Sequence, residues 1–277
     1  MTVTITAADV NKLRTQTGAG MMDCKKALQE ANGDFEAAVD ILRKKGQKVA
    51  ANRADRMASE GCVLAKVAAE GNFAIVLSLN CETDFVAKNE GFVSLTTSIL
   101  DLALKNKAKN LDQLLALKLD NLTVAEKLVE QTGVIGEKLE IGAFEYLESP
   151  ALSVYIHAGN RLATIVALNK GGDTNLEAGR QVAMQTAAMS PVAVDEKSVP
   201  DEIIKREIEV GKEQAIAEGK PAEMAEKIAM GKLNKFYKES TLLNQEFIRD
   251  SKKTVKQFLA DTDKELTVTA FKRVALG

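Results

Sequence analysis

The chain has 277 residues, of which 45% are hydrophobic and 27% charged, a composition typical of globular proteins with one or two domains. Its formal net charge of -2 argues against a protein that binds nucleic acid by neutralising phosphates, and it favours a protein surface as the partner. The three cysteines lie far apart without a C-x-x-C pair, so neither a disulfide framework nor a metal site is expected. The N-terminus lacks a signal peptide and no 18-residue apolar run is present, so we expect a cytoplasmic protein without a membrane span.

Residues 1–46 carry apolar side chains at helical spacing in three successive stretches. Val10 and Leu13 mark the first helix, residues 24–31 the second and residues 35–42 the third. Asn32-Gly33 ends one helix and Asp34 caps the next. The pattern predicts a compact three-helix unit of the ubiquitin-associated type.

The turn Gly18-Ala19-Gly20 is followed by Lys25 and Lys26, which superficially suggests a phosphate-binding loop. However, the G-x-x-x-x-G-K-[ST] pattern and a preceding strand are both missing, so a tight turn between helices is favoured. Residues 47–60 are polar and basic, and they predict a helical linker with a domain boundary.

The rest of the chain contains a weak internal repeat. Gly71-Asn72 opens a buried strand over 73–79, and Gly159-Asn160 opens a similar one. In each copy a strand enters the turn (61–67 and 153–157) and a helix follows (91–107 and 175–189). We therefore predict an α+β fold with two related halves, 61–152 and 153–277, each a small antiparallel sheet backed by helices.

Three further elements complete the predicted core. Thr123–Glu126 is a capping box that opens a short helix, and a strand is expected over 138–141. A last strand over 266–274 closes the second half. Residues 200–239 are rich in Lys and Glu and are broken at Gly219-Lys220-Pro221, so they predict an inserted antiparallel helical hairpin. Its predicted seam is formed by Ile203, Ile204, Ile208, Ile216, Met224 and Ile228.

The corner over residues 80–88 joins the strand 73–79 to the following helix. Thr83 or Asp84 is the expected N-cap. Phe85 is either a hydrophobic staple folded onto its own helix or an exposed interface anchor. The second copy has only a plain turn at 171–174, so the architecture does not require an aromatic residue here. This comparison favours the interface anchor.

An enzyme using Glu82 and Asp84 as an acid/base pair is the alternative from another class. The corner makes the two side chains diverge, and no base, nucleophile or metal-ligand set accompanies them, so we expect no enzyme activity. An adaptor of the ubiquitin-associated type is a third hypothesis, but it explains only residues 1–46.

Two long motifs resemble the elongation factor Ts family, the guanine-nucleotide exchange factors of bacterial and organellar translation. Thr83-Asp84-Phe85-Val86 is similar to the signature loop of that family, and Thr15–Leu28 to its N-terminal signature. Residues 243–248 and 253–259 are similar to its L-x-x-Q-x-F and K-T-V-x-x-L segments, so the resemblance covers nearly the whole chain. Some members carry a further C-terminal helix for which this sequence has no room, which puts that contact in doubt.

The resemblance implies binding to elongation factor Tu with GDP, release of GDP and rebinding of GTP. It implies no cofactor or metal of the chain's own, because the factor acts on the Mg-GDP of its partner. The hairpin leaves open a homodimer or a 2:2 complex. The implied exchange loop is Thr83, Asp84, Phe85 and Val86, and the implied secondary contacts are Ile135, Gly136, His157, Gly18, Gly20, Met21 and Met22. For the two methionines core filling is the alternative, and for His157 a structural or solvated residue.

Overall fold

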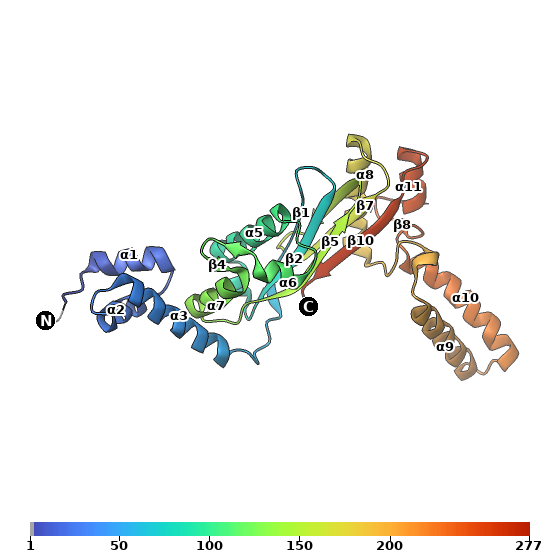
Figure 1. Cartoon of the computed structure of the whole chain (residues 1–277). Helices are drawn as coiled ribbons and strands as arrows, with labels where there is room; N and C mark the ends of the chain where they lie inside the picture. The colour runs from blue at the N-terminus through green and yellow to red at the C-terminus, as the bar shows by residue number, and fades with distance from the viewer. Residues whose placement is uncertain (1–2) are drawn as a thin grey trace.

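The structure is a computed structural model that describes residues 3–277, and three parts follow one another along its length (Figure 1). A helical N-terminal unit lies at one end, two sheets with their helices form the centre, and a helical hairpin projects at the other end. The predicted α+β class is confirmed. Within residues 3–277, no helix combines the length and apolar character needed to cross a bilayer.

The N-terminal unit consists of α1 (Ala7–Thr17), α2 (Met21–Glu30) and α3 (Phe35–Asn52). Thr6 and Asp9 form a capping box at the start of α1, and the Asp34 side chain caps α3 by accepting the Ala37 N–H at 3.0 Å. A small core holds the three helices together, as predicted. It contains Val10, Leu13, Ala19, Cys24, Ala27, Leu28 and Ala38.

Helix α3 continues past the predicted boundary at residue 46. Gly46 does not end the helix, because residues 47–52 are compatible with helix and Gly46 itself packs closely against α7 (Val124–Ile135) of the core. The predicted helical linker 47–60 is therefore the end of α3 followed by a segment without helix or strand. The domain limits themselves stay predictions.

The first half is built on an antiparallel sheet in the order β1-β2-β5, with β1 (Glu60–Val67), β2 (Phe73–Cys81) and β5 (Glu140–Glu148). The strand predicted over 138–141 begins at Glu140 and is longer than expected. The remaining elements besides α7 are α4 (Asp84–Ala87), α5 (Glu90–Lys105), α6 (Leu111–Ala116), β3 (Lys118–Leu119) and β4 (Leu122–Thr123).

The second half repeats this plan, as predicted. Its sheet has the order β10-β7-β6, with β6 (Ala151–Ile156), β7 (Leu162–Leu168) and β10 (Val268–Ala275). The other elements outside the hairpin are α8 (Asp173–Met189), η1 (Glu196–Ser198), β8 (Glu246–Phe247), β9 (Asp250–Thr254) and α11 (Val255–Thr262).

The repeat is longer than the sequence reveals. In both halves a tiny two-stranded hairpin precedes a helix that opens with a threonine capping box, and the third strand follows. The boxes are Thr123 with Glu126 before β5, and Thr254 with Gln257 before β10.

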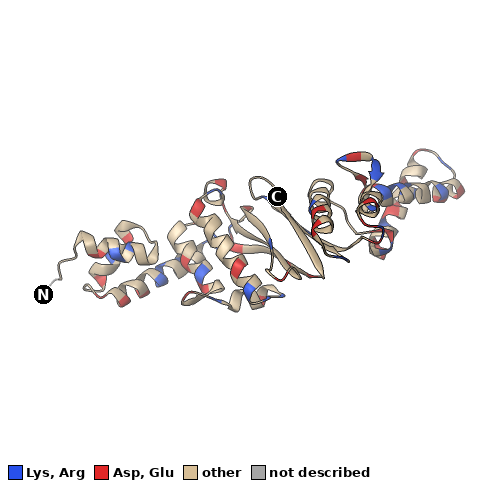
Figure 2. Cartoon of the chain, turned by 90° about the horizontal axis from the view of Figure 1, so that it is seen from above, with Lys and Arg blue, Asp and Glu red and all other residues tan. Residues whose placement is uncertain are grey.

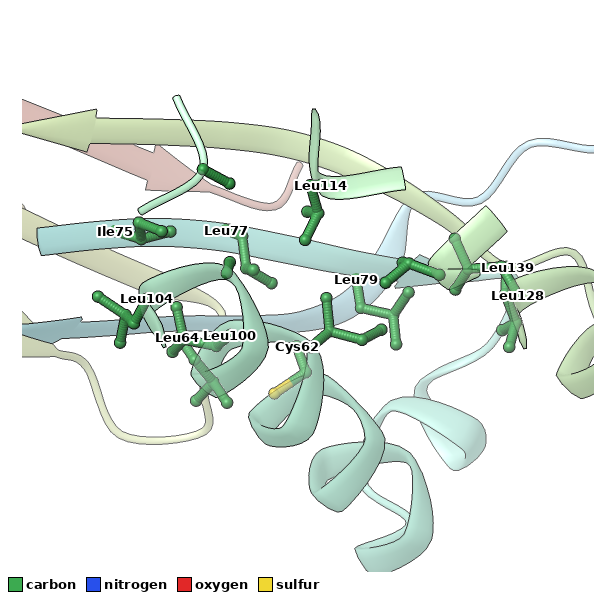
Figure 3. Packing of buried hydrophobic residues seen from close by; sticks show 14 of the residues in the cluster. Cys62, Leu64, Ile75, Leu77, Leu79, Leu100, Leu104, Leu114, Leu128 and Leu139 are labelled. Carbon is green, nitrogen blue, oxygen red and sulfur yellow. The ribbon is translucent and has the colours of Figure 1, made fainter. Parts of the chain in front are cut away.

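The two sheets pack face to face, so the core has four layers: helices, sheet, sheet and helices. In β2, Ile75 and Leu77 belong to the cluster beneath α5 and α7, where Figure 3 shows them with Leu100 and Leu104. The alternate residues Ala74 and Val76 face the second sheet. Because one side of β2 meets helices and the other meets a sheet, nearly every side chain of this strand is buried.

Helices α9 (Asp201–Ala217) and α10 (Ala222–Ser240) form the predicted hairpin, whose surface carries both signs of charge (Figure 2). The predicted seam is wrong in part, because Ile216 and Met224 are exposed. Small residues form it instead: a Cβ on Gly211 would lie 3.1 Å from Ala229 Cα. They let the two helix backbones approach closely. The buried residues of the hairpin are Gly211, Ala215, Ala225, Ala229 and Leu233.

Candidate functional site

The corner at the end of β2 is a separate helical turn, α4, between β2 and α5. Thr83 is its N-cap, since the Thr83 hydroxyl accepts the Val86 N–H at 3.4 Å. The expected helix begins only at Glu90, because Asn89 provides a second cap by accepting the Gly91 N–H at 2.8 Å. Of the two predicted caps, Thr83 is confirmed and Asp84 is the first residue of the turn.

Phe85 points into solvent from this turn, and 85% of the residue is exposed. A hydrophobic staple would bury the ring against its own helix, so the staple interpretation is wrong. The following residues, Val86 and Ala87, pack against the first core cluster instead. A large aromatic side chain is thus presented on a short turn whose other face rests on the core.

Asp84 also lies on the surface, where its carboxylate accepts a hydrogen bond from Lys88 Nζ at 2.6 Å. This hydrogen bond and the charge of Lys88 lower the pKa of Asp84 below its usual value. Asp84 is therefore ionised at neutral pH, next to the exposed ring of Phe85.

A carboxylate from a distant part of the chain holds the base of the turn. Glu137 Oε2 accepts the backbone N–H groups of Glu82 (3.1 Å) and Thr83 (3.0 Å), and Glu137 Oε1 accepts the Thr83 hydroxyl at 2.6 Å. In return, Glu82 Oε1 accepts the backbone N–H of Lys138 at 2.7 Å. Two pairs of neighbouring residues, 82–83 and 137–138, thus bind each other reciprocally. We call this arrangement the corner lock.

Arg53 connects the corner lock to the N-terminal unit. It is the C-cap residue of α3, and its Nη1 lies 2.7 Å and 2.9 Å from the two carboxylate oxygens of Glu82. The N–H of Lys138 and then the hydrogen bond from Arg53 lower the pKa of Glu82. Sequence reasoning assigned no role to Arg53 or Glu137, since these contacts join residues far apart in sequence.

Ile135 and Gly136 directly precede Glu137 and so lie beside the corner lock. Ile135 ends α7 and packs at the edge of the core, while Gly136 is the C-cap with φ +82°. This left-handed conformation favours glycine and redirects the chain, so that Glu137 follows at once and reaches the corner. The space next to Gly136 Cα is open.

His157 lies exposed in the turn between β6 and β7. Its Nδ1 is 2.9 Å from the Tyr155 hydroxyl. The same turn is tied to β1 by an ion pair between Arg161 and Glu60. Since Glu60 is paired with Cys81 in the sheet, the turn lies at the end of the core where the corner begins.

The predicted N-terminal residues surround the turn between α1 and α2. Gly18 ends α1 with φ +70°, and Gly20 is the N-cap of α2. Met21 and Met22 are 56% and 63% exposed, which disfavours core filling. A Cβ on Gly18 would lie 3.7 Å from Val134 Cγ1, next to Ile135 at the end of α7. The α1–α2 turn therefore lies against the end of α7, the helix whose C-cap directly precedes Glu137 of the corner lock.

Cys81 lies beneath the corner, with its Sγ 3.2 Å from the carbonyl oxygen of Thr83. Burial, followed by the charge of Glu137, raises the pKa of Cys81 to about 12, so the thiol stays protonated and unreactive. Among residues 3–277 no three His, Cys, Asp or Glu side chains are grouped as metal ligands would be.

Comparison with known proteins places the chain in a family. The family profile described as "Elongation factor TS" matches residues 82–277, beginning within the corner. The elongation factor Ts of Flavobacterium psychrophilum is 54% identical over 274 residues, which cover 99% of each chain. Those of Christiangramia forsetii and Porphyromonas gingivalis are 52% and 50% identical, over 99% of this chain and 99% and 98% of theirs. Because these similarities span both ends and the core, the chain belongs to the elongation factor Ts family.

Proposed function

We propose that the protein is a guanine-nucleotide exchange factor that binds elongation factor Tu in its GDP form, accelerates GDP release and so allows GTP to bind. The observation that carries the proposal is the exposed ring of Phe85 on a turn fixed at its base by the corner lock. An exposed aromatic on a rigid support suits an interface anchor, because little conformational entropy is lost when the ring is buried.

GDP is held in a GTPase by a phosphate cradle and by Mg²⁺ that bridges the phosphates to the protein. A factor that speeds release must bind the empty state better than the nucleotide-bound state. The coupling is reciprocal, so GDP weakens binding of the factor as much as the factor weakens binding of GDP. Burial of Phe85 in a gap that opens near the metal site contributes roughly 1.5–3 kcal/mol, which corresponds to about 10- to 100-fold in affinity for the empty state.

Asp84 supplies a negative charge beside the inserted ring. In the free chain the ionised carboxylate of Asp84 accepts a hydrogen bond from Lys88. In the complex it instead contacts groups of the partner that order the Mg²⁺ and phosphate site. Val86 and Thr83 support the insertion from the core side, since Val86 packs on the core and Thr83 caps the turn.

The secondary contacts flank this insertion point. We propose that Ile135 and Gly136, beside the corner lock, and His157, in the β6–β7 turn, engage the partner around the loop. Gly18, Gly20, Met21 and Met22 provide a second patch on the N-terminal unit, where exposed methionines adapt to a partner surface.

An enzyme acting through Glu82 and Asp84 is disfavoured. Glu82 is bound by Arg53 and by the Lys138 N–H, and Asp84 by Lys88, so both acids are occupied and have lowered pKa values. Neither acid is suited to donate a proton at neutral pH. In our proposal the chain breaks no covalent bond and holds no cofactor or metal, and it acts on the Mg-GDP of its partner.

The test is release of a fluorescent GDP from elongation factor Tu, with wild-type protein, with Phe85→Ala and with Ile216→Ala. Ile216 is an exposed apolar residue on the remote hairpin and serves as the matched control. We expect acceleration by wild type and Ile216→Ala, and an acceleration that Phe85→Ala lowers by about 10- to 100-fold without abolishing it. No acceleration by the wild type would reject the proposed function, and equal acceleration by Phe85→Ala would reject the role of the ring.

A further inference from the structure

Val86 and Ala87 of α4 pack only partly against the core, so this packing does not by itself fix the direction in which α4 presents Phe85. The helix has only four residues, Asp84–Ala87, and none of them is buried. A helix this short is not stable by itself. Its orientation therefore depends on the groups that bind the base of the turn, residues 82 and 83.

Those groups come from two helix ends. Residue Glu137 follows the C-cap of α7, and Arg53 is the C-cap of α3. Glu137 accepts three hydrogen bonds, from the N–H groups of residues 82 and 83 and from the Thr83 hydroxyl. Arg53 contacts both carboxylate oxygens of Glu82. Hydrogen bonds to a charged carboxylate are shorter and stronger than neutral ones.

We infer that Glu137 is a positioning residue of the exchange loop, and that Arg53 couples the orientation of the N-terminal unit to the position of Phe85. The inference rests on the proposed exchange function. Glu137 follows Ile135 and Gly136 in the chain and contacts residues 82 and 83 of the loop. The left-handed turn at Gly136 therefore positions both the predicted contacts and the carboxylate that holds the loop.

The coupling follows from how α3 and α7 meet. The two helices contact each other at Gly46 and Gly133, where a Cβ on Gly133 would lie 2.3 Å from Gly46 Cα. Beyond this contact both helices end at the corner, one through Arg53 and the other through Glu137. A rotation of the N-terminal unit about the glycine contact therefore pulls on Glu82 through Arg53, while Glu137 holds the neighbouring Thr83.

The first test is direct and needs no partner: amide hydrogen exchange at Glu82 and Thr83, followed by NMR in the full chain. Glu137→Ala removes the acceptor of both N–H groups, so their exchange should speed up by about ten-fold or more, a ratio equivalent to about 1.4 kcal/mol. Glu137→Gln should stay close to wild type, because an amide oxygen can accept both N–H groups and the amide nitrogen can donate to the Thr83 hydroxyl.

The control variant is Glu145→Ala, which removes a carboxylate on β5 whose ion pair is with Lys272, away from the corner. Its amides at residues 82 and 83 should exchange as in wild type. Unchanged exchange at these two amides in Glu137→Ala would overturn the inference.

The second test is a double-mutant cycle in the GDP-release assay. In the wild-type background, Glu137→Ala should lower the maximal acceleration by on the order of ten-fold, with Glu137→Gln restoring it. In the Phe85→Ala background, Glu137→Ala should have no further effect, because it acts through the ring. Arg53→Ala, which leaves Glu137 in place, should likewise lower the maximal acceleration in the wild-type background and have no further effect in the Phe85→Ala background.

Additive effects of Glu137→Ala and Phe85→Ala would contradict a positioning role and overturn the inference. The two proposals fail in distinguishable ways. If the wild-type protein does not accelerate GDP release, the exchange function is rejected, and the amide measurement alone decides whether Glu137 holds the corner.

Discussion

Gly46 of α3 and Gly133 of α7 lie directly against each other where the N-terminal unit meets the core. The contact is asymmetric. A Cβ added to Gly133 would lie 2.3 Å from Gly46 Cα, whereas a Cβ added to Gly46 would meet its nearest atom, the Val129 carbonyl oxygen, at 3.4 Å. The first distance is impossible without movement of a helix, and the second is an ordinary contact.

We therefore predict that Gly133→Ala displaces α3 from α7 and that Gly46→Ala does not. Both substitutions gain helix propensity of about 0.8–1.0 kcal/mol, so the pair is matched in that respect. The measurement is the rate of limited proteolysis in residues 53–59, together with the thermal unfolding temperature. Faster cleavage and lower stability are expected for Gly133→Ala only. Equal behaviour of the two variants would mean that the glycine contact does not fix the N-terminal unit.

Phe73, the first residue of β2, and Phe85, in α4 beyond the other end of that strand, should respond very differently to truncation. Phe85 is 85% exposed, so Phe85→Ala should change the free energy of unfolding by no more than about 0.5 kcal/mol. Phe73 is buried and stacks on Tyr146, so Phe73→Ala should cost about 3–5 kcal/mol. Urea unfolding of both variants measures the difference. A large loss in Phe85→Ala would indicate that the ring stabilises the fold, and its loss of exchange activity could then not be assigned to the partner interface.

The strand pairs joined at Gly71-Asn72 and Gly159-Asn160, the capping box at Thr123 and the inserted arm were predictable from the sequence because their signals are local. The packing of the two sheets was not. A strand such as 73–79, apolar at nearly every position, is buried on both faces, but its sequence does not tell whether the second face meets a helix or another sheet. Ala74 of β2 and Ala163 of β7 both lie between the two sheets. Their small side chains are the one local feature of these strands that indicates a close approach of two sheets.

For the candidate site, the sequence predicted a cap at Thr83 or Asp84, of which Thr83 is the observed one, and an exposed Phe85, the latter by comparison with the plain turn of the second copy. It did not predict the corner lock. The contact between Thr83 and Glu137 spans 54 residues, and nothing in the local pattern around Glu137 distinguishes it from a solvated acid. Helix α4 was also missed as a separate turn, because the cap expected at Thr83 or Asp84 was assigned to the helix over 91–107, whereas that helix has its own cap at Asn89.

The hydrogen bonds that Glu82 accepts from the Lys138 N–H and from Arg53 make the corner sensitive to acid. The pKa of Glu82 is lowered in the folded protein relative to its usual value of 4.5, first by the Lys138 N–H and then by Arg53. A lowered pKa means that the unfolded state binds more protons as the pH falls, so the stability from this carboxylate is present above pH 4.5 and is lost below it. We expect wild type to lose more stability than Glu82→Gln on acidification through this window.

The measurement is the free energy of urea unfolding of both proteins at several pH values on either side of 4.5. The control is Glu145→Gln, which removes one carboxylate and its ion pair with the half-buried Lys272 at the edge of the sheets. Parallel pH profiles for wild type and Glu82→Gln would show that the lowered pKa of Glu82 does not contribute to stability.

The α9–α10 hairpin should be dispensable for folding of the core and for nucleotide exchange. Its base is closed by hydrogen bonds outside residues 200–239: Val192 N–H donates to the carbonyl of Ser240, the last residue of α10, at 2.8 Å, and Leu242 N–H donates to the Ala193 carbonyl at 2.9 Å. Replacing residues 200–239 by a short glycine-serine linker keeps these bonds, and loop-closure entropy changes only slowly with loop length. The thermal transition of the core and the maximal rate of GDP release should be retained, as measured by circular dichroism and the fluorescent GDP assay.

Light scattering of the wild-type and the deleted protein then tests whether the hairpin is a subunit contact. If it is, the deleted protein should form smaller oligomers, so its mass should fall by more than the mass of the deleted residues. A lost exchange rate with an unchanged thermal transition would instead assign the hairpin to the partner interface.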